Sequence, residues 1–257
     1  LDLNLCAQVY IDILIKMGPA FMKTIGMLGG MSWESTAVYY RAINEGIKAK
    51  LGSLHSAEII LKSLDFEKIE QLQHAGDWEA TAAILKKAAK SVEVAGADFL
   101  IICTNTMHIV APEISNHIKI PILHIADATG ERLIKDKISS VGLLGTNFTM
   151  EKPFYKDRLR KKYGIEVVVP PSEERARLHE IIYGELCCGI VKRSSKDFYL
   201  EVIDKLTTAG VEGIILGCTE IGMLVSFEDT DIRLYDTTEI HADQAVNFAL
   251  KGKLKTS

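Results

Sequence analysis

Two stretches of the chain share one pattern: Ala95-Gly-Ala-Asp-Phe-Leu-Ile-Ile-Cys-Thr104 and Ala209-Gly-Val-Glu-Gly-Ile-Ile-Leu-Gly-Cys218. Each contains a short apolar run next to glycine, which is typical of a buried strand in a parallel sheet. A second pair, Ile25-Gly-Met-Leu-Gly-Gly-Met-Ser32 and Val141-Gly-Leu-Leu-Gly-Thr-Asn-Phe148, recurs in the same order at nearly the same offset. The repetition indicates two α/β halves related by duplication.

Strand-like and helix-like segments alternate along the chain, which predicts parallel sheets covered by helices. We therefore expect an α/β fold of two pseudo-symmetric parallel-sheet domains, with the active site in the cleft between them. Residues 22–123 together with 229–257 are predicted to form the first domain, and residues 124–228 the second. Residues 1–21 are interpreted as an extension that takes no part in the fold.

The repeat also aligns two polar triplets, each at the end of an apolar strand. Thr104-Asn105-Thr106 falls opposite Cys218-Thr219-Glu220. The carboxyl ends of parallel strands face the ligand crevice in open α/β sheets. If the halves face each other, Thr104 and Cys218 enter one cleft from opposite sides. Such a pair suits proton transfer at a carbon whose two faces must both be reached.

The composition excludes several classes of protein. A net charge of −4 gives no basic surface for nucleic acid, and no apolar stretch is long enough to span a membrane. Five cysteines, an odd number spread thinly, are typical of reduced thiols in a cytoplasmic protein rather than of a disulfide framework. His117 and His124 lack further ligands at metal-binding spacing, and Gly26–Gly30 departs from the dinucleotide fingerprint, so we expect neither metal nor nucleotide.

Three motifs together resemble the aspartate/glutamate racemase family and, within it, the broad-specificity amino-acid racemase branch. They are Gly26-Met-Leu-Gly-Gly-Met-Ser-Trp-Glu-Ser-Thr36, Cys103-Thr-Asn-Thr-Met-His108 and Gly217-Cys-Thr-Glu220, and His124-Ile-Ala-Asp-Ala-Thr129 also fits. The resemblance spans essentially all of residues 22–250. It implies a racemase that needs no cofactor, acts on a small amino-acid substrate and forms a homodimer.

In the typical family member each half supplies one catalytic cysteine. Here the second-half position is Cys218, whereas the first-half position holds Thr104, and a cysteine stands one residue earlier at Cys103. Neighbouring residues of a strand point to opposite faces, so Cys103 is expected to point away from the cleft, although it remains the rival first-half acid. A hydroxyl is a weaker acid than a thiol and a poor base. The resemblance therefore implies that Cys218 deprotonates the L-enantiomer and Thr104 protonates the other face, which favours L-to-D turnover.

Racemisation without pyridoxal phosphate requires stabilisation of negative charge on the substrate carboxylate. Backbone N–H groups and hydroxyls after strand ends suit this role, so we expect substrate binding by Ser32, Asn105-Thr106 and Thr219. Glu220 is expected to orient a neighbour or to contact the substrate ammonium group. His108 is interpreted as a residue that steadies the loop through backbone hydrogen bonds.

Family members that act on acidic substrates hold the side-chain carboxylate with cationic residues. By motif placement, the corresponding positions here are Gln73 and Glu185, neither of which is cationic. The resemblance therefore predicts non-acidic substrates, and Gln73, which can donate and accept hydrogen bonds, suits a hydroxylated side chain such as that of homoserine.

Other functions remain open at this stage. The Thr104/Cys218 asymmetry is compatible with other carbanion-type enzymes of the superfamily: aspartate/glutamate racemase proper, hydantoin racemase, maleate isomerase or arylmalonate decarboxylase. A protein that binds amino acids without catalysis is the alternative from another class. Taken alone, Cys218 is also compatible with a buried structural cysteine, and Cys187 and Cys188 are interpreted as helix packing residues.

Overall fold

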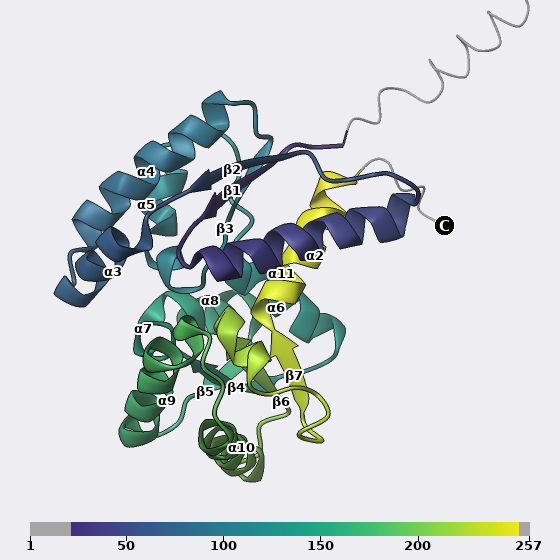
Figure 1. Ribbon diagram of the computed structural model, residues 1–257. Helices are drawn as coiled ribbons and strands as arrows, with labels where there is room; N and C mark the ends of the chain where they lie inside the picture. The colour runs from purple at the N-terminus through teal and green to yellow at the C-terminus, as the bar shows by residue number, and fades with distance from the viewer. Residues whose placement is uncertain (1–21, 252–257) are drawn as a thin grey trace, which may run out of the picture.

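The computed structural model describes residues 22–251 (Figure 1), so the expectation for residues 1–21 lies outside the described residues. Two sheets form the framework, and every strand pair in them is parallel. The first sheet has the order β2-β1-β3, and the second has the order β5-β4-β6-β7. Their strands are β1 (Ile25–Gly29), β2 (Ile59–Ser63), β3 (Phe99–Ile102), β4 (Ser140–Gly145), β5 (Glu166–Val168), β6 (Gly213–Gly217) and β7 (Arg233–Asp236). The predicted α/β fold with two parallel-sheet halves is confirmed.

The strand order shows what the sequence repeat encodes. β1 and β4 carry the repeat that begins at Ile25 and Val141 and lie inside their sheets, and β3 and β6 carry the repeat that begins at Ala95 and Ala209 and pair with them. The repeated glycine has a physical reason in both halves. A Cβ at Gly26 would lie 2.5 Å from Val92 Cγ1, and one at Gly142 would lie 2.9 Å from Leu206 Cδ1. In both halves, a side chain of a covering helix lies directly against the glycine and would have to shift for a larger residue.

Alternation along β1 and β3 gives the first sheet two buried faces. Leu28 and Ile102 pack on one face, which is covered by α3, α4 and α5, while Met27 and Ile101 pack on the other, which is covered by α2 and α11 (Figure 1). The helices are α2 (Trp33–Leu51), α3 (Phe66–Ala75), α4 (Trp78–Val94), α5 (Ala111–Ser115) and α11 (Thr237–Ala249). Fully buried strands explain why these segments are continuously apolar.

The second sheet packs with its helices into a single apolar cluster. Three short 3₁₀ turns, η1 (Thr106–Val110), η2 (Leu186–Cys188) and η3 (Thr219–Met223), complete the described chain. The helices of this half are α6 (Ile125–Lys135), α7 (Asn147–Glu151), α8 (Pro153–Tyr163), α9 (Ser172–Gly184) and α10 (Arg193–Thr208). No helix within residues 22–251 is long and apolar enough to cross a membrane.

The halves exchange their last helices. Ile122 bridges to Leu100 beside β3, and the following helix α6 packs into the core of the second half. In the same way, β7 pairs with β6, and the following helix α11 packs on the first sheet and also contacts α6 (Figure 1). The expectation that residues 229–257 join the first half is therefore wrong for β7, because its backbone pairs with β6. The exact domain limits stay a prediction.

Candidate active site

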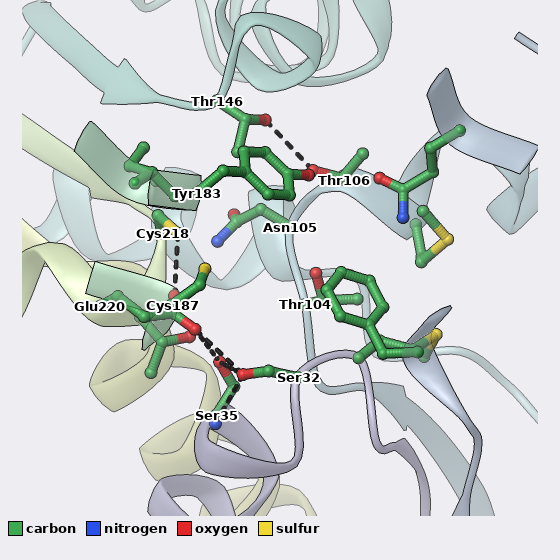
Figure 2. Close-up of a pocket in the computed structure, with 17 residues that line it drawn as sticks. Ser32, Ser35, Thr104, Asn105, Thr106, Thr146, Tyr183, Cys187, Cys218 and Glu220 are labelled. Atoms are coloured by element: carbon green, nitrogen blue, oxygen red, sulfur yellow. Dashed lines mark hydrogen bonds between the residues drawn. The ribbon is translucent and has the colours of Figure 1, made fainter. Parts of the chain in front are cut away.

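A cavity lies where β3 and β6 end, between the two halves (Figure 2). Residues of both halves and of the turns η1 and η3 contribute to its wall. The free space inside is about 40 Å³, enough for a few water molecules. Its lining residues are Met31, Ser32, Ser35, Phe66, Gln73, Thr104, Asn105, Thr106, Met107, Thr146, Ile182, Tyr183, Cys187, Gly217, Cys218, Thr219 and Glu220.

Cys218 enters the cavity directly after β6. Its Sγ donates a hydrogen bond of 2.9 Å to Oε2 of Glu220 in the following turn η3. Burial and then the charge of Glu220 raise the pKa of the Cys218 thiol well above its usual value. In the free protein the thiol is therefore protonated and hydrogen-bonded to the carboxylate.

Glu220 also joins the two halves. Its Oε1 accepts hydrogen bonds of 3.0 Å from the hydroxyls of Ser32 and Ser35, which belong to the first half (Figure 2). Ser32 is the N-cap of α2 and accepts a hydrogen bond from the Ser35 amide, so the helix start fixes both hydroxyls. The positive end of the α2 dipole adds to the stabilisation of this buried carboxylate.

Thr104 enters the same cavity after β3, from a different side than Cys218 (Figure 2). Residues 22–251 form no hydrogen bond to its hydroxyl, whereas its backbone carbonyl lies 2.9 Å from Nδ1 of His108. Nε2 of His108 accepts from the Ile125 amide at 3.3 Å, so Nδ1 carries the proton and donates to Thr104. Burial, followed by the nearby His124 and His241, lowers the pKa of His108 well below its usual value and keeps it neutral.

Cys103 lies on the opposite face of β3 from the cavity. It is fully buried with Ile101 and Tyr39 in the cluster under α2 and α11. Burial raises the pKa of its thiol far above the usual value. The structure therefore gives Cys103 no access to the cavity, as strand alternation predicts.

The expected substrate-binding residues next to Thr104 and Cys218 all line the cavity. Asn105 donates to Thr237 Oγ1 at 3.0 Å, while its buried Oδ1 has no partner among the described residues. Thr106 shares a hydrogen bond of 3.3 Å with Thr146 across the two halves, and Thr219 accepts one of 3.1 Å from Thr238. Asn105 therefore offers the cavity an open acceptor.

The two positions expected to contact the substrate side chain lie in different places. Gln73 lines the cavity, is 2% exposed, and its Oε1 has no partner among the described residues. Glu185 does not line the cavity: its carboxylate accepts from Ser195 at 2.5 Å and pairs with Lys192 at 3.2 Å. Ser195 and Lys192 thus hold the Glu185 carboxylate outside the cavity lining, and its contact with a substrate stays a prediction.

Several lining residues are absent from the sequence-based expectations. Cys187, expected to be a helix packing residue, belongs to the turn η2 and lines the cavity, where burial and then Glu220 raise its pKa to about 12. Thr146 could have been found, because the sequence repeat aligns it with Gly30, two residues before Ser32. Ser35 lies within the Gly26–Thr36 motif, whereas Tyr183 follows no pattern that marks it in one sequence.

Within residues 22–251, no group of three His, Cys, Asp or Glu side chains is placed to hold a metal ion. Fold and site together define an α/β protein of two duplicated halves, with a thiol and a hydroxyl entering one cavity from pseudo-equivalent strands. Residues 28–245 match the family described as Asp/Glu/Hydantoin racemase, and the chain belongs to this family. Its members are isomerases that need no cofactor, so the protein is an enzyme of this class.

Two solved structures and one curated protein sequence agree with this assignment. A Yersinia pestis protein, provisionally described as an Asp/Glu racemase, is 52% identical and superimposes with a TM-score of 0.85, covering 89% of this chain and 100% of that one. An aspartate racemase homologue from Pyrococcus horikoshii is 36% identical with a TM-score of 0.78, over 89% and 99% of the two chains. The glutamate racemase of Aquifex aeolicus is 28% identical over 148 residues, which are 54% of this chain and 52% of that protein.

Proposed function

We propose that the protein is an amino-acid racemase that moves the α-proton between Cys218 and Thr104. The observation that carries this proposal is their placement: both line one cavity, and they follow β6 and β3, the pseudo-equivalent strands of the two halves. A reaction that inverts a carbon needs proton-transfer groups on both faces, and the duplicated fold supplies two positions of this kind.

In the forward direction, the Cys218 thiolate removes the α-proton of the L-amino acid, and Thr104 supplies a proton to the opposite face. The intermediate carries negative charge on its carboxylate. Backbone N–H groups at the starts of η1 and η3, with the hydroxyls of Thr106 and Thr219, can stabilise that charge. The cavity lies between the two halves, so their closure on a bound substrate would exclude water.

The proposed preference for L-to-D turnover has a defined kinetic meaning. Enantiomers have equal free energy, so kcat/KM is the same in both directions. The bias appears in kcat and KM separately: the D-enantiomer requires Thr104 to act as a base, which a hydroxyl does poorly. A low kcat and a correspondingly low KM are expected for the D-enantiomer.

The substrate is proposed to be a non-acidic amino acid with a hydrogen-bond donor in its side chain, such as homoserine. No lysine, arginine or histidine lines the cavity among the described residues, so a second substrate carboxylate has no cation to pair with it. The unpartnered Oε1 of Gln73 suits a hydroxyl that donates a hydrogen bond.

The test is proton NMR of single amino acids in D₂O with the purified protein, followed by chiral chromatography. Loss of the α-proton signal and appearance of the D-enantiomer are expected for homoserine and other neutral amino acids. Cys218→Ala is expected to lower the rate at least 10³-fold. Full turnover by Cys218→Ala would exclude the assignment, and faster turnover of aspartate than of any neutral amino acid would exclude the substrate proposal.

The presence of a thiol in only one half of the site favours a second candidate, another carbanion reaction such as decarboxylation of a malonate. Release of carbon dioxide from arylmalonates, without exchange of amino-acid α-protons, would identify it. A protein that only binds amino acids would show neither reaction. By family, we also propose a cytoplasmic homodimer, for which analytical ultracentrifugation is the direct test of assembly.

A further inference from the structure

The start of α11 contacts one cavity-lining residue of each half. Its first two residues, Thr237 and Thr238, are 0% and 1% exposed, and neither lines the cavity. The hydroxyl of Thr237 bonds the side chain of Asn105 from the first half, and the hydroxyl of Thr238 bonds that of Thr219 from the second. A single helix start thus reaches the polar residues that follow both β3 and β6.

The backbone of this helix start is fixed by its N-cap. Oδ1 of Asp236 accepts hydrogen bonds from the amides of Thr238 at 2.7 Å and Glu239 at 3.2 Å. The strand β7 ends at Asp236 and pairs with β6, the strand that leads to Cys218. The cap and the strand pairing therefore hold both threonine hydroxyls at a set position in the fold.

The direction of the hydrogen bonds at Thr237 follows from the chemistry of its partners. Its Oγ1 lies 2.9 Å from the carbonyl oxygen of Leu216 in β6, and a carbonyl can only accept, so the Thr237 proton is committed to that bond. The oxygen of Thr237 can then only accept, and Nδ2 of Asn105 donates to it at 3.0 Å. Oδ1 of Asn105 therefore stays on the other side of the amide, without a partner among the described residues.

The second threonine orients a hydroxyl instead of an amide. Thr238 donates a hydrogen bond of 3.1 Å to Oγ1 of Thr219. Because a hydroxyl has a single proton, Thr219 keeps its own proton for another acceptor, and none of the hydrogen bonds among residues 22–251 uses it. Since Thr219 and Asn105 both line the cavity, its wall offers a donor from the second half and an acceptor from the first.

We propose that Thr237 and Thr238 are positioning residues that set the hydrogen-bond polarity of the cavity. Thr237 holds Asn105 as an acceptor toward the ligand, and Thr238 holds Thr219 as a donor. The inference rests on the proposed racemase function, in which the free proton of Thr219 is offered to the substrate carboxylate. It defines a rule of specificity: a ligand fits when it brings an acceptor to Thr219 and a donor to Asn105, and loss of either α11 hydroxyl relaxes that rule.

Side-chain NMR of the ligand-free protein tests the orientation of the amide. The side-chain NH₂ signal of Asn105 is identified as the one missing in Asn105→Ala. In the wild type, one of its two hydrogens is expected to exchange with solvent at least about tenfold more slowly than the other, because it is bonded to Thr237. The difference is expected to persist in Thr237→Ser, which keeps a hydroxyl, and to vanish in Thr237→Val, which keeps the shape without one.

Racemisation kinetics test what this orientation does. Thr237→Val is expected to lower kcat/KM for the L-substrate about tenfold, mainly through KM, and Thr237→Ser is expected to stay within about twofold of the wild type. In an Asn105→Ala background, the same Thr237→Val change is expected to cost nothing further, because the side chain that it positions is gone. Thr238→Val is expected to behave in the same way toward a Thr219→Val background.

Thr81→Val is the matched control for these substitutions. It also removes a buried hydroxyl that donates to a backbone carbonyl, but at the start of α4 and outside the cavity lining, so unchanged kinetics are expected. A merely structural role of Thr237 would make Thr237→Val equally costly with and without the Asn105 side chain.

Three results would overturn the inference: equal exchange of the two Asn105 hydrogens in the wild type, an unchanged kcat/KM in Thr237→Val, or a loss that is just as large in the Asn105→Ala background. The exchange of the wild-type amide needs neither a substrate nor a folded Thr237 variant, so it decides the inference even if Thr237→Val does not fold. A wild-type protein that exchanges no amino-acid α-protons would reject the racemase proposal and leave the orientation of Asn105 to be decided by that amide signal.

Discussion

The two halves of the cavity share a scaffold but hold their reactive residues by different means. Cys218 is held through its side chain, by the hydrogen bond from its sulfur to Glu220. Thr104 is held through its backbone, by the hydrogen bond that His108 donates to its carbonyl. In the repeat, Gly222 stands opposite His108 and Thr106 opposite Glu220, so neither support has a counterpart. Duplication has kept the strands and their close-packed glycines, while the residues just beyond the strand ends have diverged.

The largest change in activity is expected when the hydroxyl of Thr104 is replaced by a thiol, so that both halves carry the same reactive group. Thr104→Cys places a thiol on both sides of the cavity, and a thiol can act as a base where a hydroxyl cannot. We expect kcat for D-to-L turnover to rise about 10²-fold, with kcat/KM still equal in the two directions because the equilibrium constant is unity. Chiral chromatography of saturated reactions started from each enantiomer measures both kcat values.

Cys103→Ala is the control for this substitution, since it removes the neighbouring thiol that lies on the opposite face of β3. Its two kcat values are expected to match those of the wild type. A gap between the directions that is unchanged in Thr104→Cys, or abolished in Cys103→Ala, would show that Thr104 is not the first-half proton-transfer residue.

The sequence predicts the scaffold and the two reactive positions because both depend on local patterns. Apolar runs next to Gly26 and Gly142 mark strands on which helices pack closely, and the repeat aligns Thr104 with Cys218 without any structure. Alternation along β3 places Cys103 on the far face for the same local reason.

Contacts between distant segments are not predictable in this way. The carboxylate of Glu220 meets Ser32 and Ser35 only because the two halves close on each other, and nothing in the spacing of these residues indicates it. The motif placement of Glu185 beside the substrate is not matched by the cavity lining, because helical segments align poorly by motif. The assignment of β7 failed because backbone pairing with β6 is decided by the sheet rather than by the periodicity of the tail.

The chain passes from one half to the other just before α6 and just before α11, and we call these two connections the first and the second crossover. They differ in how their stability depends on pH. His124 caps α6 and Asp236 caps α11, the two exchanged helices. Burial, followed by the charge of Arg158, lowers the pKa of His124 to about 3; burial lowers that of His241, which bonds the Leu123 carbonyl, to about 4. Burial raises the pKa of Asp236 to about 6. The first crossover therefore needs neutral imidazoles, whereas the second holds a carboxylate that protonates easily.

Lowering the pH is expected to destabilise the first crossover more than it stabilises the second. Histidines with lowered folded-state pKa values bind fewer protons folded than unfolded, so the free energy of unfolding falls as the pH falls below about 6.5. Asp236 acts in the opposite direction between about pH 6 and 4, because it binds more protons when folded. His124, His241 and Asp236 together are expected to contribute a net loss of about 2 kcal/mol between pH 7 and pH 5, and His108, whose pKa burial also lowers, adds to this loss. Urea unfolding at each pH measures it.

Asp236→Asn keeps the helix cap and removes the opposing titration. Its loss of stability between pH 7 and pH 5 is expected to be steeper than that of the wild type by about 1 kcal/mol. A wild-type stability that is flat or rises on acidification would contradict the assignment of neutral histidines to the crossover.

The smallest expected effect tests whether His108 serves the first half alone. His108→Asn keeps a donor for the Thr104 carbonyl and loses the acceptor for the Ile125 amide, so kcat for L-to-D turnover is expected to fall about fivefold, the value of one neutral hydrogen bond. A double-mutant cycle with Thr104→Ser should show coupling, because both changes act on the same proton transfer, whereas a cycle with Glu220→Gln should be additive. Additivity in the first cycle, or coupling of equal size in both, would mean that His108 supports the whole interface and that the two reactive residues are not held independently.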